Sequence, residues 1–255
     1  MTRFIHRVPL RFLILSDIHA NGEALKAVHA DAVTRGFDLT LCLGDVVGYG
    51  PDPNEAAAWV STYADVVVRG NHDRACSNLS DYDSFHPLAQ HSAAWTKEQL
   101  LPCHVEWLAQ LPRGPLQVDN FDLVHGAPDD EDRYLFDAEE AAASLRHAAE
   151  QVTFFGHTHV QGGFVSRRPT GSTAALRFQT VPAQLTLEED SLYLLNPGSV
   201  GQPRDGDPRA AYCIYEAHTS VAYFYRVEYD IRTAQEKILA AGLPEELAYR
   251  LATGR

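Results

Sequence analysis

The amino-acid sequence predicts a mixed α/β fold, and two observations support this. In roughly the first 160 residues, short apolar runs alternate with segments whose apolar residues recur at helical spacing. Further along the chain, strand-like segments follow one another with short turns between them. Early alternation of strands and helices is typical of α/β sheets. The length of 255 residues suits one large domain, and we find no internal repeat or low-complexity linker, so we expect a single domain over residues 1–255.

Five apolar runs are predicted to be buried strands, because each is short and ends at once in turn residues. They span residues 12–15, 39–43, 66–68, 121–124 and 152–155. Open α/β sheets bind their ligands in the crevice beyond the carboxyl ends of the strands. Polar residues that follow these runs are therefore expected to gather in one cleft.

Helices are predicted between these strands and at the end of the chain. Residues 22–30 have helical spacing after an Asn-Gly turn, and Pro53 opens a second helix through Val60. The region 83–111 is the largest insertion between polar strand ends; it is predicted to form two helices separated near Pro102 and is placed to form a wall of the cleft. Residues 231–251 are predicted to form one or two helices, interrupted at the Gly-Leu-Pro sequence.

The second half of the chain is predicted to be rich in strands. The segments 184–187, 191–195, 211–215 and 221–227 show the alternation expected of strands, and the last two are predicted to form a hairpin. We expect this C-terminal half to supply a second sheet.

Each of the five early strand ends carries side chains that can bind a metal. The motifs are Asp17-Ile18-His19, Gly44-Asp45, Gly70-Asn71-His72-Asp73, His125-Gly126 and Gly156-His157-Thr158-His159. Taken singly, they have ordinary explanations: Gly-Asp is common in turns, and Asn or Asp can cap a helix. The His-x-His motif is more specific, because alternate residues of an extended segment point the same way. The occurrence of all five, each after a strand, favours a metal site.

These motifs resemble those of the calcineurin-like metallophosphoesterase family, whose pattern is Asp-x-His, Gly-Asp, Gly-Asn-His-Asp/Glu, a lone His and Gly-His-x-His. They occur in the family's order over residues 17–159, with no substitution at a ligand position. The later Asn196-Pro197-Gly198-Ser199-Val200 resembles a strand-end turn of the small single-domain bacterial and archaeal members. The resemblance implies a four-layer αββα sandwich, in which two mixed β-sheets are flanked by helices.

The resemblance also implies a centre with two metal ions. Asp17, His19 and His159 would bind one metal, and Asp45 would bridge both. The other metal would be bound by Asn71, His125 and His157. Mixed nitrogen and oxygen ligands suit Mn²⁺, Fe²⁺, Zn²⁺ or Ni²⁺ better than Ca²⁺. Ligand softness does not separate these four ions, and we favour Mn²⁺ for activity.

The implied reaction is hydrolysis of a phosphate ester by a hydroxide that bridges the two metals. A phosphodiester is favoured over a monoester, because the short motif spacing resembles that of the small phosphodiesterase-like members. A Ser/Thr protein phosphatase or a dinucleoside polyphosphate hydrolase is the alternative enzyme. The alternative outside enzymes is a catalytically silent metal-binding scaffold, although such scaffolds usually lose ligands and every implied ligand is present here.

Two residues of the third motif are implied to act in catalysis. The family's histidine at the position of His72 lies by the scissile phosphate, where as imidazolium it can steady negative charge or protonate the leaving oxygen. Asp73 then either orients His72 through a carboxylate hydrogen bond or is a first-turn residue of the following helix.

Five residues are candidate substrate contacts, because each follows a ligand-bearing turn or can fold near one. They are Tyr49, Arg74, His91, Arg133 and Arg204. Arginine suits bidentate contacts to phosphate. A solvated surface charge is the alternative for each arginine, and a structural histidine is the alternative for His91.

Composition narrows the partners and the compartment. The chain is 45% hydrophobic and 22% charged, as is ordinary for a soluble protein, and it has no apolar run long enough to cross a membrane. A formal net charge of −13 argues against extended nucleic acid. The family resemblance implies a small phosphate ester as the partner. The four cysteines lack paired spacing, and the charged N-terminal segment is too short for a secretory signal, so we expect reduced thiols in a cytoplasm. The oligomeric state is not legible from the sequence.

Overall fold

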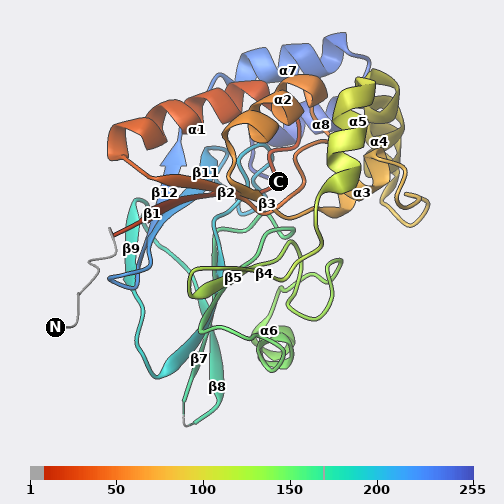
Figure 1. Ribbon diagram of the computed structural model, residues 1–255. Coiled ribbons are helices and arrows are strands. Elements are labelled where there is room, and N and C mark those ends of the chain that lie inside the picture. Colours follow the sequence, from red (N-terminus) through yellow and green to blue (C-terminus); the bar gives the residue numbers. More distant parts are fainter. Residues whose placement is uncertain (1–8, 169) are drawn as a thin grey trace, which may run out of the picture.

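A computed structural model describes residues 9–168 and 170–255, which form two six-stranded sheets with helices on the outside (Figure 1). The first sheet has the order β3 (Val66–Val67), β2 (Leu39–Cys42), β1 (Arg11–Leu15), β11 (Ala210–Glu216), β12 (Val221–Val227) and β9 (Ala183–Thr186). Strands β1, β2 and β3 are parallel, whereas β11, β12 and β9 pair antiparallel. This sheet is therefore mixed.

The second sheet is mixed as well. Its order is β4 (Leu116–Val118), β5 (Phe121–Leu123), β6 (Val152–Phe154), β10 (Ser191–Asn196), β7 (Gly162–Arg167) and β8 (Ser172–Leu176). Strands β5, β6 and β10 are parallel, and the remaining pairs are antiparallel. The predicted α/β class with two mixed sheets is confirmed.

The expectation that the C-terminal half supplies a second sheet was wrong. Strands β9, β11 and β12 complete the first sheet, and β7, β8 and β10 complete the second. Strand β11 pairs directly with β1, with Phe12 opposite Tyr215 and Ile14 opposite Cys213. All four side chains are buried, so this pairing closes the core. Alternation along a strand reveals which residues share a face, but it does not identify the neighbouring strand.

The two sheets pack face to face through alternate side chains of their strands. On β1, Phe12 and Ile14 point to the core between the sheets, whereas Leu13 and Leu15 point to the helices. Phe121 of the second sheet meets Phe12 edge-on, with 5.1 Å between ring centroids. This packing fixes the distance between the two sheets and hence between the loops at their ends.

The helices cover both outer faces. They are α1 (Gly22–Arg35), α2 (Pro53–Tyr63), α3 (Asn71–Cys76), α4 (Pro87–Gln99), α5 (Pro102–Gln110), α6 (Ala138–Leu145), α7 (Ile231–Ala240) and α8 (Glu245–Leu251). Helix α1 packs on β11 and β12, and α6 packs on the second sheet at the opposite side of the molecule (Figure 1). The helices predicted from residue 22, from residue 53, within 83–111 and at the C-terminal end are all present.

Two smaller observations complete the fold. The four cysteines are free thiols; three are buried and Cys103 is exposed. Among the described residues, no helix is long and apolar enough to span a bilayer.

Candidate metal centre

The predicted motifs meet at one place, beyond the carboxyl ends of strands from both sheets. Asp17, Asp45 and Asn71 follow β1, β2 and β3 of the first sheet. His125 and His157 follow β5 and β6 of the second. Because the two sheets pack face to face, their loops converge at this shared edge.

Seven polar side chains come together there, and all of them are buried. Asp17, His19, Asp45 and His159 form one group of possible metal-binding atoms. Asp45 also belongs to a second group with His125 and His157. Asn71 joins the second group, since its Oδ1 lies 3.2 Å from Nε2 of His125. Two clusters that share one carboxylate are the arrangement predicted for a pair of metals.

Five of these residues adopt backbone conformations that side chains rarely take. The φ angles are 52° at Asp17, 47° at His19, 52° at Asp45, 64° at His157 and 59° at His159. Left-handed backbone costs about 1–3 kcal/mol for a residue other than glycine and is concentrated at functional sites. Hydrogen bonds between neighbouring loops hold the strained segments, as where His19 N donates to the Asp45 carbonyl over 2.9 Å.

Two glycines allow the loops to approach this closely. A Cβ atom at Gly156 would collide with the Ser16 hydroxyl oxygen, and one at Gly70 would collide with the Asp45 carboxylate. Any larger residue at either position would therefore push a carboxylate-bearing loop away from the centre.

The Asn-Pro-Gly-Ser turn after β10 ties the two sides of the site together. Nδ2 of Asn196 donates to the carbonyl of Gly156 over 2.9 Å. The hydroxyl of Ser199 donates to the Asp17 carbonyl over 2.8 Å. The turn thus connects a loop of the second sheet with a loop of the first.

His19 and His159 present the same ring atom to the first cluster. Nδ1 of His19 lies 3.1 Å from the Val47 carbonyl, and Nδ1 of His159 lies 2.6 Å from the Gln202 carbonyl. A carbonyl can only accept, so each Nδ1 carries the proton and each neutral ring has its lone pair on Nε2. The two Nε2 atoms are 3.2 Å apart. Two lone pairs that face each other across this distance repel unless a cation lies between them.

The second cluster repeats this arrangement with one ring reversed. Nδ1 of His125 lies 2.8 Å from the Leu43 carbonyl, so its Nε2 faces inward. Nε2 of His157 lies 3.2 Å from the Asp132 carbonyl, so its Nδ1 faces inward. The two inward nitrogens are 3.1 Å apart. Backbone partners that orient imidazoles in this way are the usual surroundings of metal-binding histidines.

The protonation states also suit metal ions. Burial lowers the pKa of His19, His157 and His159 well below the ordinary value, so these rings are neutral at pH 7 and their lone pairs are free. Burial would lower the pKa of His125 too, but the carboxylate of Asp45 raises it to about 10. In the metal-free chain, a proton on His125 therefore offsets the charge of Asp45.

The two carboxyl groups respond differently to burial. Burial raises the pKa of Asp17 to about 6. Burial acts on Asp45 in the same direction, but the neighbouring imidazoles of His125 and His72 outweigh it and hold its pKa well below the usual range. With four imidazoles, two carboxyl groups and an amide, the site fits borderline divalent cations, since it offers nitrogen and oxygen but no sulfur.

His72 lies beside the cluster and lines the adjoining pocket. Its ring packs against Tyr49, His19 and Phe85, with centroids 4.5, 5.0 and 4.9 Å away. Its Nδ1 is buried and has no hydrogen-bond partner among the described residues. Burial lowers the pKa of His72 to about 4, which favours the neutral ring. An anion beside the ring would act in the opposite direction, towards the expected imidazolium.

Asp73 does not orient His72, so the first of its two predicted roles was wrong. Its Oδ1 accepts hydrogen bonds from the N–H groups of Val46 and Val47, and its Oδ2 accepts one from Gly70. Asp73 is a first-turn residue of α3 that holds the loop carrying Asp45.

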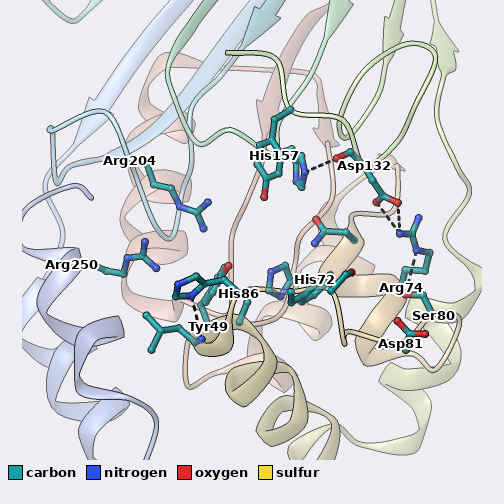
Figure 2. Close-up of a pocket in the computed structure, with 16 residues that line it drawn as sticks. Tyr49, His72, Arg74, Ser80, Asp81, His86, Asp132, His157, Arg204 and Arg250 are labelled. Carbon is teal, nitrogen blue, oxygen red and sulfur yellow. Dashed lines mark hydrogen bonds and ion pairs between the residues drawn. The ribbon is translucent and has the colours of Figure 1, made fainter. Parts of the chain in front are cut away.

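A pocket of about 600 Å³ opens next to the cluster (Figure 2). Asn71, His72 and His157 line the side that adjoins the cluster, which we call the base of the pocket. The segment that enters α4 contributes Phe85 and His86, so the helical insertion forms part of the wall as expected. Tyr49, Arg74 and Arg204, three of the five candidate substrate contacts, also line the pocket.

The other two predicted substrate contacts lie elsewhere. His91 is on an exposed face of α4 and does not line this pocket. Arg133 turns towards Asp129, with 2.6 Å between Nη1 and Oδ2, and it does not line the pocket either. Proximity in sequence to a polar turn was insufficient, because the direction of a side chain depends on local backbone geometry.

Four residues of the pocket lacked a sequence signal strong enough to predict them. Tyr134 stacks on the ring of His157 with 3.7 Å between centroids and covers its outer side. Phe85 and His86 precede a helix, and Arg250 lies on the last helix. The nearest signal was the aromatic character of Tyr134 in an otherwise polar loop after the His125 motif.

Arg74 belongs to a network centred on Glu131. The carboxylate of Glu131 accepts two hydrogen bonds from Arg69, over 3.0 and 2.9 Å, and lies 2.6 Å from Nη1 of Arg74. Arg74 also makes two hydrogen bonds to Asp132, over 2.8 and 2.7 Å. These carboxylates neutralise the guanidinium of Arg74, which therefore supports the wall of the pocket.

Replacing Glu131 by glutamine is expected to lower the free energy of unfolding by about 1–2 kcal/mol at pH 7. Burial opposes ionisation of Glu131, but Arg69, Arg74 and Arg113 lower its pKa below the ordinary 4.5. The lowered pKa means that ionised Glu131 stabilises the fold fully above pH 4.5. This stabilisation is lost as the pH falls below 4.5 and through the lowered pKa. Urea unfolding of the wild type and Glu131→Gln should show a difference in the free energy of unfolding that becomes smaller below pH 4.5. Glu98→Gln, at an exposed position, is the control, and a difference independent of pH would contradict this account.

Comparison with known proteins identifies the class to which this fold and site belong. A model of the calcineurin-like phosphoesterase superfamily domain matches residues 10–220, and the chain belongs to that family. The predicted family, and with it the class of metal-dependent phosphoesterases, is thus confirmed.

Individual relatives extend over nearly the whole chain. An uncharacterized protein of Methanocaldococcus jannaschii is 34% identical over 245 residues, which cover 95% of this chain and 97% of the relative. The crystal structure of a metallophosphoesterase from Sphaerobacter thermophilus is 38% identical, with a TM-score of 0.84 over 97% of this chain and 100% of that one. A hypothetical protein of Pyrococcus horikoshii shares the fold at 20% identity, with a TM-score of 0.75 over 96% of this chain and 98% of that one.

Proposed function

We propose that this chain hydrolyses a phosphodiester with the help of two divalent metal ions. The observation that carries the proposal is the pairing of four imidazoles around Asp45. In each pair, two inward ring nitrogens face each other over 3.1–3.2 Å, and the outward ring N–H groups point to carbonyls. A cation between the inward nitrogens would stabilise each pair, and in the second pair it would replace the proton that His125 holds in the metal-free chain.

The assignment of ligands follows the two clusters. Asp17, His19 and His159 would hold one ion, and Asp45 would contribute to both, since its Oδ2 lies 3.5 Å from Nε2 of His19 and 3.5 Å from Nε2 of His125. The remaining ligands of the second ion would be Asn71, His125 and His157. We favour Mn²⁺ among the ions that accept this donor set.

The chemistry divides between the ions and the side chains. When bound, two divalent ions would polarise phosphoryl oxygens and lower the pKa of water. His72 lies at the pocket side of the cluster, where it can donate a proton to the leaving oxygen. Tyr49 and Phe85 hold its ring in place, and Tyr134 keeps water from the outer side of His157.

The shape of the pocket favours a diester over a monoester. Figure 2 shows His72 and His157 between two walls, with Arg204 and Arg250 on one side and Arg74 and Asp81 on the other. A phosphorus atom held at the base can therefore carry substituents that extend in both directions. A diester has two such substituents, and a monoester has one.

The test compares two esters with metal-stripped and reloaded protein. Bis-p-nitrophenyl phosphate and p-nitrophenyl phosphate are supplied with and without Mn²⁺, and Asn71→Ala is assayed beside the wild type. Asn120→Ala, in an exposed turn, is the control. We expect turnover of the diester that requires both Mn²⁺ and Asn71. Faster turnover of the monoester would contradict the diester preference, and no turnover of either ester with any divalent ion, in folded protein, would contradict the proposal itself.

A further inference from the structure

Two arginines line the same wall of the pocket, and neither forms an ion pair with an Asp or Glu side chain among the described residues. Arg204 and Arg250 both point into the pocket (Figure 2). Within residues 9–168 and 170–255, no Asp or Glu oxygen lies within ion-pair distance of either guanidinium. This is unexpected in a chain that has 34 acidic residues against 21 basic ones. The cost of bringing two such groups together suggests that the wall is built for an anion.

Arg204 is anchored directly to the metal cluster. Its backbone N–H donates to the carbonyl of His159 over 3.2 Å, and the carbonyl of Gln202 accepts from the ring of the same histidine. Its guanidinium lies over the ring of Tyr49, 5.5 Å from the centroid, and Nη2 donates to the side chain of Gln202. Nε is buried and has no partner among the described residues. Arg204 thus retains unused donors next to the centre.

Arg250 lies on α8 and lines the same pocket. Its Nε donates to the backbone oxygen of Arg255, the last residue of the given sequence, over 2.7 Å. The same C-terminal segment is joined to the loop of Arg204, because Gly206 N donates to the carbonyl of Gly254 over 2.9 Å. Burial lowers the pKa of Arg250, and the positive charge of Arg204 lowers it further, since like charges repel each other. Their relative placement is therefore set by the fold and not by mutual attraction.

The opposite wall provides an internal comparison. Arg74 also lines the pocket, but Glu131 and Asp132 neutralise it. Asp81 adds a further acidic side chain on that side. The pocket consequently has a positive wall and a wall of opposite or neutral character. Such polarity orients a substrate that carries charge at only one end.

We propose that Arg204 and Arg250 form a second anion subsite, and that the substrate is a phosphate ester carrying a second phosphate group. The inference rests on the proposed function for the position of the scissile phosphate, and it adds the chemical class of the substrate. The scissile phosphate occupies the base of the pocket, and the second phosphate accepts hydrogen bonds from the two guanidinium groups. Paired N–H donors of arginine match the oxygens of phosphate.

The experiment measures binding rather than turnover. The full chain loaded with Mn²⁺ is titrated calorimetrically with methylphosphonate, methylenebisphosphonate and 1,3-propylenebisphosphonate, which differ in the second anionic group and its distance. At least one bisphosphonate is expected to bind about tenfold more tightly than methylphosphonate. Arg250→Gln should abolish this advantage, and Arg250→Lys should retain part of it. Arg232→Gln, an exposed arginine on the preceding helix, should leave it intact.

The outcomes separate the subsite from the hydrolytic function. Equal binding of all three ligands by the wild type, or an advantage that persists in Arg250→Gln, would overturn the subsite. Hydrolysis of bis-p-nitrophenyl phosphate together with equal binding of the three phosphonates would support the proposed function and contradict the second anion subsite. An advantage that depends on Arg250, in protein that hydrolyses no ester, would support the subsite and contradict the proposed hydrolysis.

Discussion

Replacing Asp45 by asparagine is expected to lower kcat/KM for ester hydrolysis by well over 100-fold. Mutating a residue that only hydrogen-bonds a metal ligand already lowers metal affinity or activity by about 10–100-fold, and Asp45 is itself a proposed ligand. Asp45 belongs to both clusters, so its loss affects both proposed ions at once. The change removes one negative charge but keeps an oxygen at Oδ1, which accepts a hydrogen bond from His72 N over 2.9 Å. The loop should therefore keep its conformation while metal affinity falls.

The measurement combines turnover with the metal content of the purified protein. Asp190→Asn is the matched control, since Asp190 is exposed in a turn before β10 and belongs to neither metal cluster. Asp45→Asn should contain less metal than the wild type and unfold at a similar urea concentration, whereas the control should match the wild type in both. Full activity with reduced metal content would show that the two-metal account is wrong.

Replacing His72 by asparagine is expected to lower kcat by about 10²–10⁴-fold, the usual contribution of a positioned acid or base. Metal content should stay the same, because His72 belongs to neither metal cluster. The loss should depend on the leaving group. p-Nitrophenolate can leave without a proton, whereas an alkoxide cannot, so the variant should be impaired more with an alkyl ester than with a nitrophenyl ester.

This dependence separates a catalytic role from a structural one. A variant that merely distorted the pocket would lose activity towards both esters in equal proportion. His147→Asn serves as the control, since His147 is exposed beyond α6. An equal loss with both esters would contradict proton donation by His72, and reduced metal content would assign the residue to the support of the metal site.

Much of the centre was predictable because its information is local in sequence. Each proposed ligand follows an apolar strand directly, and the rule that ligands bind beyond the carboxyl ends of strands brings such residues together. The direction of the rings was not predictable. It depends on carbonyls such as that of Gln202, which lies 43 residues from the histidine it orients.

The errors have a common physical cause. Strand β1 pairs with β11 as well as with β2, and the alternation of buried side chains along a strand does not identify its neighbours. The sequence around Asp73 fits either of its two predicted roles. The structure distinguishes them, because three backbone N–H groups donate to its carboxylate. Arg250 has no motif near it, because α8 reaches the pocket only through the packing of the last two helices.

The most direct test of the central claim is a titration of metal-stripped protein with Mn²⁺, in which bound metal and hydrolysis of bis-p-nitrophenyl phosphate are measured at every point. The two clusters around Asp45 predict that two equivalents bind and that activity rises only as the second is taken up. Saturation at two equivalents without turnover of any phosphate ester would contradict the claim that this centre is hydrolytic. Full activity at one equivalent would contradict the claim that it needs two ions.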